Sequence, residues 1–157
     1  MKIRLLCIGA VKDPTVSECI ARYAKRIPFY WPFEIENLPD VKTGKGIDAQ
    51  KQKELEGDRM LAEIGNGDFL LLLDERGHCY TSREFADYLN KKGIDGNRNL
   101  VMAVGGPYGF CKRVYDRADG MLSLSSMTFP HELVRLFLVE QIYRAGTILR
   151  GEPYHHD

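Results

Sequence analysis

The chain has 157 residues, of which 44% are apolar and 28% are charged, as is usual for a globular protein that buries a core without disulfides or metals. Lysine and arginine total 22, as do aspartate and glutamate, so the zero net charge argues against a surface that is basic all round but permits a local basic patch. No apolar run approaches the roughly 18 residues of a membrane span, and the N-terminus resembles a first strand more than a signal peptide. We therefore expect a cytoplasmic protein that does not enter a membrane.

Strand-like and helix-like segments alternate along the chain. Short apolar or alternating runs predict strands at 3–9, 33–38, 68–74, 99–106 and 120–125. Helices are expected near 14–27, 48–65, 82–92, 110–118 and 130–149. The third and fourth strand runs are continuously apolar, which is typical of strands covered on both faces. The pattern predicts an α/β fold with a mainly parallel sheet and helices on both faces.

The connection 39–53, PDVKTGKGIDAQKQK, is the most loop-like stretch of the chain. It carries Lys42, Lys45, Lys51 and Lys53 among glycines, with two aspartates as partial offset. One interpretation is a solvated surface loop. The other is a basic arm that contacts nucleic-acid phosphates.

The turn VGGPYGF (104–110) follows a buried strand and leads into a helix. Ligands of open α/β sheets bind at the carboxyl ends of strands, and Gly105 and Gly106 would allow a ligand close to the backbone. A tight connection without a ligand is the alternative. The dinucleotide fingerprint after the first strand and the P-loop pattern are both absent from the sequence, so a phosphate-held nucleotide is disfavoured.

The C-terminal helix is expected to start at Pro130, which suits a first turn, with Thr128 or a neighbour as its cap. Its apolar residues cover more than one face, so the helix should lie between its own sheet and a further surface, most simply a partner subunit. His131 and Arg135 are spaced i,i+4, as are Glu140 and Arg144, and charges on so apolar a helix need partners. The tail after it, which holds Tyr154, is by default frayed.

The four cysteines, Cys7, Cys19, Cys79 and Cys111, include no C-x-x-C pair. Reduced thiols with packing roles are expected, and no metal site is predicted.

LLLLDERG, VGGPYG, LSLSSMTFPHELVRLFLVEQIYRA and RGEPYH, in this order and over the whole chain, resemble the RlmH family. These are SPOUT-class methyltransferases that modify N3 of a pseudouridine in large-subunit ribosomal RNA. The resemblance implies a single SPOUT methyltransferase domain over residues 1–157, with a C-terminal trefoil knot that forms the pocket for S-adenosyl-L-methionine (SAM). It also implies a homodimer, with the pocket near the subunit interface, and no metal.

The resemblance further implies site residues. The SAM contacts would be Leu73, Gly105, Leu124, Ser125, Ser126, Met127, Thr128 and Phe129. The candidates for catalysis are Arg135 and Arg144, to anchor phosphate or developing carbonyl charge, and Tyr154 and His155, to contact the base, with His155 as a possible proton acceptor. The implied substrate is pseudouridine 1915 of 23S rRNA in the assembled 70S ribosome.

Two other functions remain open on the sequence. One is a SPOUT methyltransferase that acts on transfer RNA, and the other is a dimeric module that binds an adenosine compound without catalysis. A nucleotide-dependent oxidoreductase is disfavoured, because the early glycine fingerprint is absent.

Overall fold

The computed structural model describes residues 1–42, 44–96 and 99–156. Within them, five strands form one sheet in the order β2-β1-β4-β3-β5, and all neighbouring strands are parallel. The strands are β1 (Lys2–Ile8), β2 (Phe33–Leu38), β3 (Asp68–Cys79), β4 (Asn99–Val104) and β5 (Gly120–Ser123). The helices are α1 (Pro14–Ala24), the short 3-10 helix η1 (Ile27–Phe29), α2 (Ala49–Ala62), α3 (Ser82–Ile94), α4 (Lys112–Arg117) and α5 (His131–Leu149). The predicted parallel α/β fold is confirmed.

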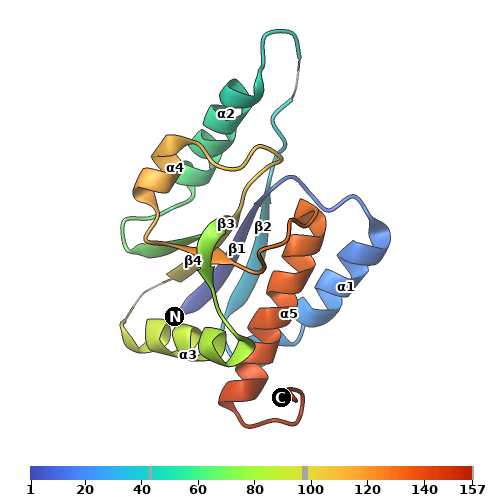
Figure 1. Cartoon of the computed structure of the whole chain (residues 1–157), viewed down its shortest axis with the longest axis vertical. Coiled ribbons are helices and arrows are strands. Elements are labelled where there is room, and N and C mark those ends of the chain that lie inside the picture. Colours follow the sequence, from blue (N-terminus) through green and yellow to red (C-terminus); the bar gives the residue numbers. More distant parts are fainter. Residues whose placement is uncertain (43, 97–98, 157) are drawn as a thin grey trace.

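Helices cover both faces of the sheet (Figure 1). On one face, Leu5 and Met102 of the central strands pack in a cluster with Leu138 of α5, and α1 and α3 flank this helix. On the other face, Leu6 packs in a cluster with Met60 of α2 and with residues of α4. The central strands have apolar residues on both faces because each face has its own helical layer, as their continuous apolar runs predicted.

Strand β3 differs most from its prediction, because it continues to Cys79 instead of ending at Asp74. Its pairing with β5 shifts, so that Leu73 and His78 both lie opposite Leu122. The intervening residues leave the ladder as a bulge. Gly77 permits this bulge, since a Cβ there would lie 2.5 Å from the Leu122 backbone.

Helix α5 begins at His131, directly after Pro130, and no side chain caps it. The expectation that Thr128 caps this helix is therefore wrong. Glu132 in the first turn accepts hydrogen bonds from the backbone N–H groups of Lys12, at 2.7 Å, and Asp13, at 3.4 Å. The start of α5 is thus joined to the start of α1.

All five strands point the same way, so their carboxyl ends meet at one edge of the sheet. The loops after β2, β3, β4 and β5 leave from this edge, which is where open α/β sheets bind ligands. The trefoil knot stays a prediction, because strand order and pairing do not record which loop the chain passes through. Over the three described ranges, no helix combines the length and the apolar character needed to cross a bilayer.

Candidate functional site

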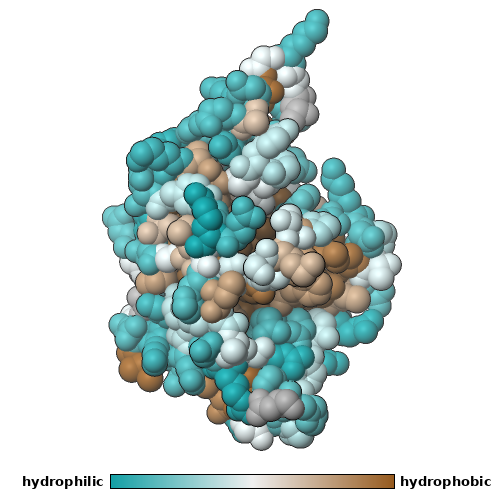
Figure 2. Space-filling model, viewed as in Figure 1, coloured by the Kyte–Doolittle hydropathy of each residue, from teal (hydrophilic) through white to brown (hydrophobic). Residues whose placement is uncertain are grey.

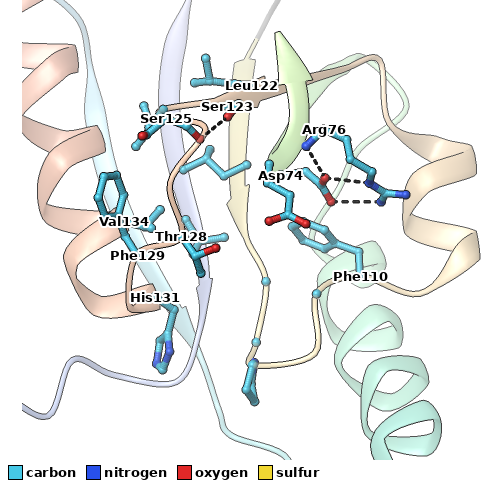
Figure 3. A pocket seen from close by; sticks show the side chains of 18 of the residues that line it. Asp74, Arg76, Phe110, Leu122, Ser123, Ser125, Thr128, Phe129, His131 and Val134 are labelled. Atoms are coloured by element: carbon cyan, nitrogen blue, oxygen red, sulfur yellow. Dashed lines mark hydrogen bonds and ion pairs between the residues drawn. The ribbon is translucent and has the colours of Figure 1, made fainter. Parts of the chain in front are cut away.

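A cavity of about 430 Å³ lies at the carboxyl edge of the sheet. The bulge within β3 and the turn after β4 form one side, and the loop after β5 and the start of α5 form the other (Figure 3). Its wall consists of 73–76, 104–110, 122–125, 127–129, Tyr115, His131 and Val134. A volume of this size, with mixed apolar and polar walls, is typical of a small-molecule or cofactor site.

The glycine turn 104–110 lies between the cavity and helix α2. Gly109 has a φ of +77° and donates its N–H to the Gly106 carbonyl at 3.1 Å, which closes the turn. A Cβ at Gly106 would lie 2.4 Å from Glu56 Oε2, so the buried Glu56 carboxyl group would have to shift to admit a side chain there. The conformation of this part of the cavity wall therefore depends on α2 behind it.

Glu56 is a buried carboxyl group behind the glycine turn, and it is only 3% exposed. Gln52 donates to its Oε1 at 2.9 Å, whereas Oε2 has no hydrogen-bond partner in the part of the chain that the structure describes. Burial raises the pKa of Glu56 above its ordinary value, and the nearby charge of Asp40 adds to this shift. Sequence analysis missed this residue, since α2 is a polar helix that shows no sign of what lies opposite it.

The loop after β5 is held by its own hydroxyl groups. Ser123 donates to the Ser125 carbonyl at 2.9 Å, and Ser125 Oγ accepts the N–H of Met127 at 3.0 Å. Phe129 packs edge-on against Phe137 of α5, with ring centroids 5.2 Å apart. The loop thereby presents backbone groups and apolar side chains to the cavity.

The β3 bulge adds a charged cluster to the opposite wall. Arg76 donates from Nε and Nη2 to Asp74, at 3.0 and 3.2 Å, and Tyr115 donates its hydroxyl to Asp74 at 2.5 Å. The Arg76 guanidinium also lies over the Tyr115 ring, 4.8 Å from its centroid. The hydrogen bonds from Arg76 and Tyr115 lower the pKa of Asp74 to about 2, so the carboxyl group is ionised at neutral pH. The motif LLLLDERG contained this cluster, but only its leucine was assigned a role from the sequence.

The residues predicted to contact SAM gather around this one cavity. All of them except Ser126 belong to its wall: Leu73, Gly105, Leu124, Ser125, Met127, Thr128 and Phe129. Ser126 lies in the same loop, between two wall residues.

The C-terminal tail folds back onto α5 and is not frayed. Arg144 donates to Glu140 at 2.6 Å, and the Tyr154 hydroxyl donates to the same carboxylate at 3.0 Å. His155 Nδ1 lies 3.3 Å from Arg144 Nη1, and the Arg144 guanidinium lies 4.7 Å from the Tyr154 ring centroid. We call Glu140, Arg144, Tyr154 and His155 the tail cluster.

In the tail cluster, Tyr154 and His155 each carry a proton that can be donated in a hydrogen bond. Burial, together with hydrogen bonds to Tyr23 and Glu140, raises the pKa of Tyr154, so its hydroxyl keeps its proton. Arginine only donates, so Nδ1 of His155 is the acceptor in its contact with Arg144. A neutral His155 then carries its proton on Nε2.

The tail cluster is separate from the cavity within one chain. Val134 is the last residue of α5 in the cavity wall, and Arg144 comes ten residues later. At the rise of an α-helix the separation is about 15 Å along the axis. A second hollow of about 320 Å³, which includes Phe129, Phe137 and Glu140, lies between them.

Arg135 belongs neither to the cavity wall nor to the tail cluster. It is 2% exposed and points under α5, where Nη1 donates to the Gly9 carbonyl at 2.7 Å and Nη2 to the Ile8 carbonyl at 2.5 Å. Both terminal nitrogens of the guanidinium are thus held by backbone carbonyls, and the residue borders a separate hollow of about 500 Å³ between α1 and the sheet. Its contacts join α5 to the end of β1, so we leave it out of the catalytic set proposed below.

Among the residues placed by the structure, no group of three or more His, Cys, Asp or Glu side chains is arranged to hold a metal ion. All four cysteines are free, and Cys7 and Cys111 are buried. Burial raises the pKa of the Cys7 thiol to about 11, so it is not a thiolate at neutral pH.

The parallel sheet, the carboxyl-edge cavity and the loop after β5 define an α/β protein with a small-molecule site at the carboxyl edge of its sheet. A family model described as predicted SPOUT methyltransferases matches residues 1–155, and the chain belongs to this family. The solved structure of a probable methylase family protein from Haemophilus influenzae Rd KW20 has the same fold, with a TM-score of 0.52 and 10% identity over 99% of this chain and 70% of that one.

Curated relatives place the chain more narrowly, in the RlmH branch of that family. The ribosomal RNA large subunit methyltransferase H of Parabacteroides distasonis is 48% identical over 157 residues, which is 100% of both chains. That of Christiangramia forsetii is 46% identical over 156 residues, which is 99% of both chains.

Proposed function

We propose that this protein is a single-domain, SAM-dependent methyltransferase that methylates N3 of pseudouridine 1915 in 23S rRNA. It would act as a cytoplasmic homodimer on the assembled 70S ribosome. The observation that carries the proposal is the cavity at the carboxyl edge, whose wall contains the predicted SAM-contact residues in a chain of this family.

The cavity has the chemistry that SAM requires. Leu73, Leu124 and Met127 offer an apolar slot for an adenine ring, and the backbone of the glycine turn and of the loop after β5 can pair with its polar edge. SAM has no phosphate, in agreement with the absence of a P-loop. It also carries positive charge, which suits the ionised Asp74 in the wall. When bound, it would supply an electrophilic methyl group.

The protein must then align N3 of the base with that methyl group, and positioning of this kind supplies much of the rate gain. The imide N3 becomes nucleophilic only when its proton leaves, and negative charge then spreads to the carbonyl oxygens beside it. Tyr154 would offer its hydroxyl to the base on leaving Glu140, His155 would offer a ring N–H, and Arg144 adds a positive charge held by Glu140. We assign these groups to the developing charge, with the proton released to solvent.

Within one chain, the tail cluster is too far from the cavity to serve it. A homodimer resolves this separation if the tail cluster of one subunit faces the cavity of the other. Phe137, which is 40% exposed beside the second hollow, provides apolar surface for such an interface. Each reaction site would then contain a SAM cavity from one protomer and base contacts from its partner.

The proposal is tested with purified protein, labelled SAM and ribosomes that lack the modification, followed by mapping of the methylated nucleotide. Loss of one preorganised donor by Tyr154→Phe or His155→Ala should lower kcat by about 100-fold and leave SAM affinity unchanged. Full rates in both variants would contradict the tail assignment. Methylation of transfer RNA alone, or SAM binding without any methyl transfer, would support one of the two alternative functions.

Mixed dimers test the shared site directly. Gly106→Val should disable the cavity and Tyr154→Phe the tail, so each homodimer should be nearly inactive. Random exchange of subunits would give about half heterodimers with one intact site each, and so about a quarter of wild-type activity. No recovery on mixing, with exchange verified, would show that both groups act within one chain.

A further inference from the structure

Residues 39–42 and 44–53 belong to a projecting basic arm with its cations at Lys42, Lys45, Lys51 and Lys53. It leaves the sheet at the carboxyl end of β2 and extends beyond the body of the protein before it enters α2 (Figure 1). Figure 2 shows that this projection is hydrophilic, in contrast to the apolar side chains that gather on the middle of the same face. The arm therefore offers charge and backbone to a partner, and little apolar surface.

The four lysines of the arm have no ion-pair partner among the described residues. Asp48 is occupied as the N-cap of α2, where it accepts the N–H of Lys51 at 2.7 Å. The acids further along α2 are also occupied, because Arg113 pairs with Glu54 at 2.8 Å and Asp58 at 2.7 Å. The arm thus keeps an excess of positive charge on a chain whose net charge is zero.

One of these cations, Lys51, occupies a position that disfavours the local structure. The first turn of α2 contains no acidic residue, and Lys51 lies three residues after the N-cap, where glutamate is the favoured choice. A cation near a helix N-terminus is opposed by the positive end of the helix dipole. Violations of local preference without a compensating contact tend to mark functional surfaces.

The root of the arm is part of the support of the cofactor cavity. Lys51 and Lys53 lie on helix α2, which also carries the buried Gln52 and Glu56. Glu56 in turn lies against Gly106 of the glycine turn. Lys53 borders the gap between α2 and the glycine turn. Strands β2 and β4 are separated by β1 alone, so the two loops leave the sheet about 10 Å apart. Nucleic acid held by the arm would therefore lie beside the mouth of the cavity.

We propose that the basic arm is a docking surface for the RNA backbone, which holds phosphates of the ribosomal RNA while the target nucleotide enters the cavity. This inference rests on the proposed function. Lysines are flexible point charges that bind phosphates without reading sequence, and such contacts fix register and orientation. The arm would supply most of the salt-dependent part of the affinity, because its four lysines and two aspartates give it a formal charge of +2, whereas the remainder of the chain has a formal charge of −2.

The test compares two double variants with the same change of charge. Lys42→Gln/Lys45→Gln alters the arm. Lys25→Gln/Lys91→Gln is the matched control, since these exposed lysines also lack a carboxylate partner among the described residues and lie at the end of α1 and in the last turn of α3, at the opposite edge of the sheet. Binding of each protein to ribosomes is measured by co-sedimentation across a salt series, and SAM affinity is measured separately.

The arm variant should bind ribosomes several-fold more weakly, and the slope of log affinity against log salt should fall by about 1 for each lysine that touches a phosphate. The control should behave as wild type, and SAM affinity should be unchanged in both. Equal affinities and slopes for arm variant and control would overturn the proposal. So would a defect that is present on ribosomes but absent on protein-free 23S rRNA, because the partner would then be a ribosomal protein.

These outcomes are independent of catalysis. If wild-type protein binds ribosomes through the arm but transfers no methyl group to them, the arm stands and the proposed reaction fails. If methylation proceeds and the arm variant has wild-type KM for ribosomes, the reaction stands and the arm proposal fails.

Discussion

Arg135 provides the sharpest prediction, because its place in the MTFPHELVR motif suggested a catalytic role, whereas its contacts in the structure indicate a structural one. Its two hydrogen bonds to Ile8 and Gly9 join the first turns of α5 to the end of the first strand, across more than 120 positions of the sequence. Arg135→Met keeps the length and apolar stem of the side chain and removes the guanidinium. We expect the variant to be destabilised, and its effect on methylation to follow from that loss.

The magnitude follows from the contacts. A hydrogen bond from a charged donor contributes about 1.5–3 kcal/mol, and its loss leaves a buried carbonyl without a partner. Removal of the buried charge recovers part of this, because the cation no longer needs to be desolvated. The two contacts together give an expected loss of about 3 kcal/mol. For a chain of this length that is a fall of roughly 6–12 °C in Tm.

The free energy of unfolding is measured by urea titration, with the thermal midpoint as a second measurement. Arg22→Met is the matched control, since Arg22 is 60% exposed in an i,i+4 pair with Glu18 and should contribute less than about 0.5 kcal/mol. If Arg135→Met kept wild-type stability and SAM affinity but lost ribosome methylation, Arg135 would act in the reaction and the structural reasoning would be wrong.

Two further predictions concern the cavity wall. Gly106→Ala places a Cβ against Glu56, and a strain of about 1.4 kcal/mol should weaken SAM binding tenfold, as measured by calorimetry. Gly67→Ala is the control and should leave SAM affinity unchanged, because no atom lies within 4 Å of a Cβ at that position. Equal SAM affinities in the two variants would show that α2 does not constrain the glycine turn. Folding lowers the pKa of Asp74 to about 2, so its ionised form stabilises the protein above the unfolded-state pKa and this contribution disappears as pH falls towards 2. Because Arg76 is largely exposed, the contribution should be about 1 kcal/mol, and urea titrations between pH 5 and 2 should show it in wild type but not in Asp74→Asn.

The sheet could be predicted from the sequence, because its strands are short apolar runs between turn residues and both of their faces are covered. The β3 bulge could not be predicted in the same way. Asp74, Glu75 and Arg76 form a polar run that indicates a turn, and the strand is seen to resume only from the pairing of residues 78 and 79 with β5. Gly77 was the available signal, since a glycine within a strand often marks a bulge.

The residues of the candidate site differ in the same way in how far they could be predicted from the sequence. The glycine turn could be located because it follows a buried strand, and the loop 124–129 because its motif resembles that of the RlmH family. The environments of Glu56 and Arg135 could not, since helical spacing defines which face a residue occupies but not what lies opposite. Gly106 lies against Glu56, which is fifty positions earlier in the sequence, and Arg135 donates to Gly9, which is near the opposite end of the chain.

The geometry of helix α5 is the reason why the proposed reaction site would need two copies of the chain. Its first turns border the cavity at Val134, its middle buries Leu138 and Ile142 against the sheet, and its end carries Arg144 with the tail. Because the helix is rigid, the roughly 15 Å between its two functional ends cannot close within one chain. Two copies packed through the remaining apolar face could bring opposite ends together, and the side chains that associate the subunits would then also set the distance between methyl donor and base. A substitution at Phe137 should accordingly impair dimer formation and kcat together while leaving SAM affinity intact, and loss of dimerisation with full activity would contradict this coupling.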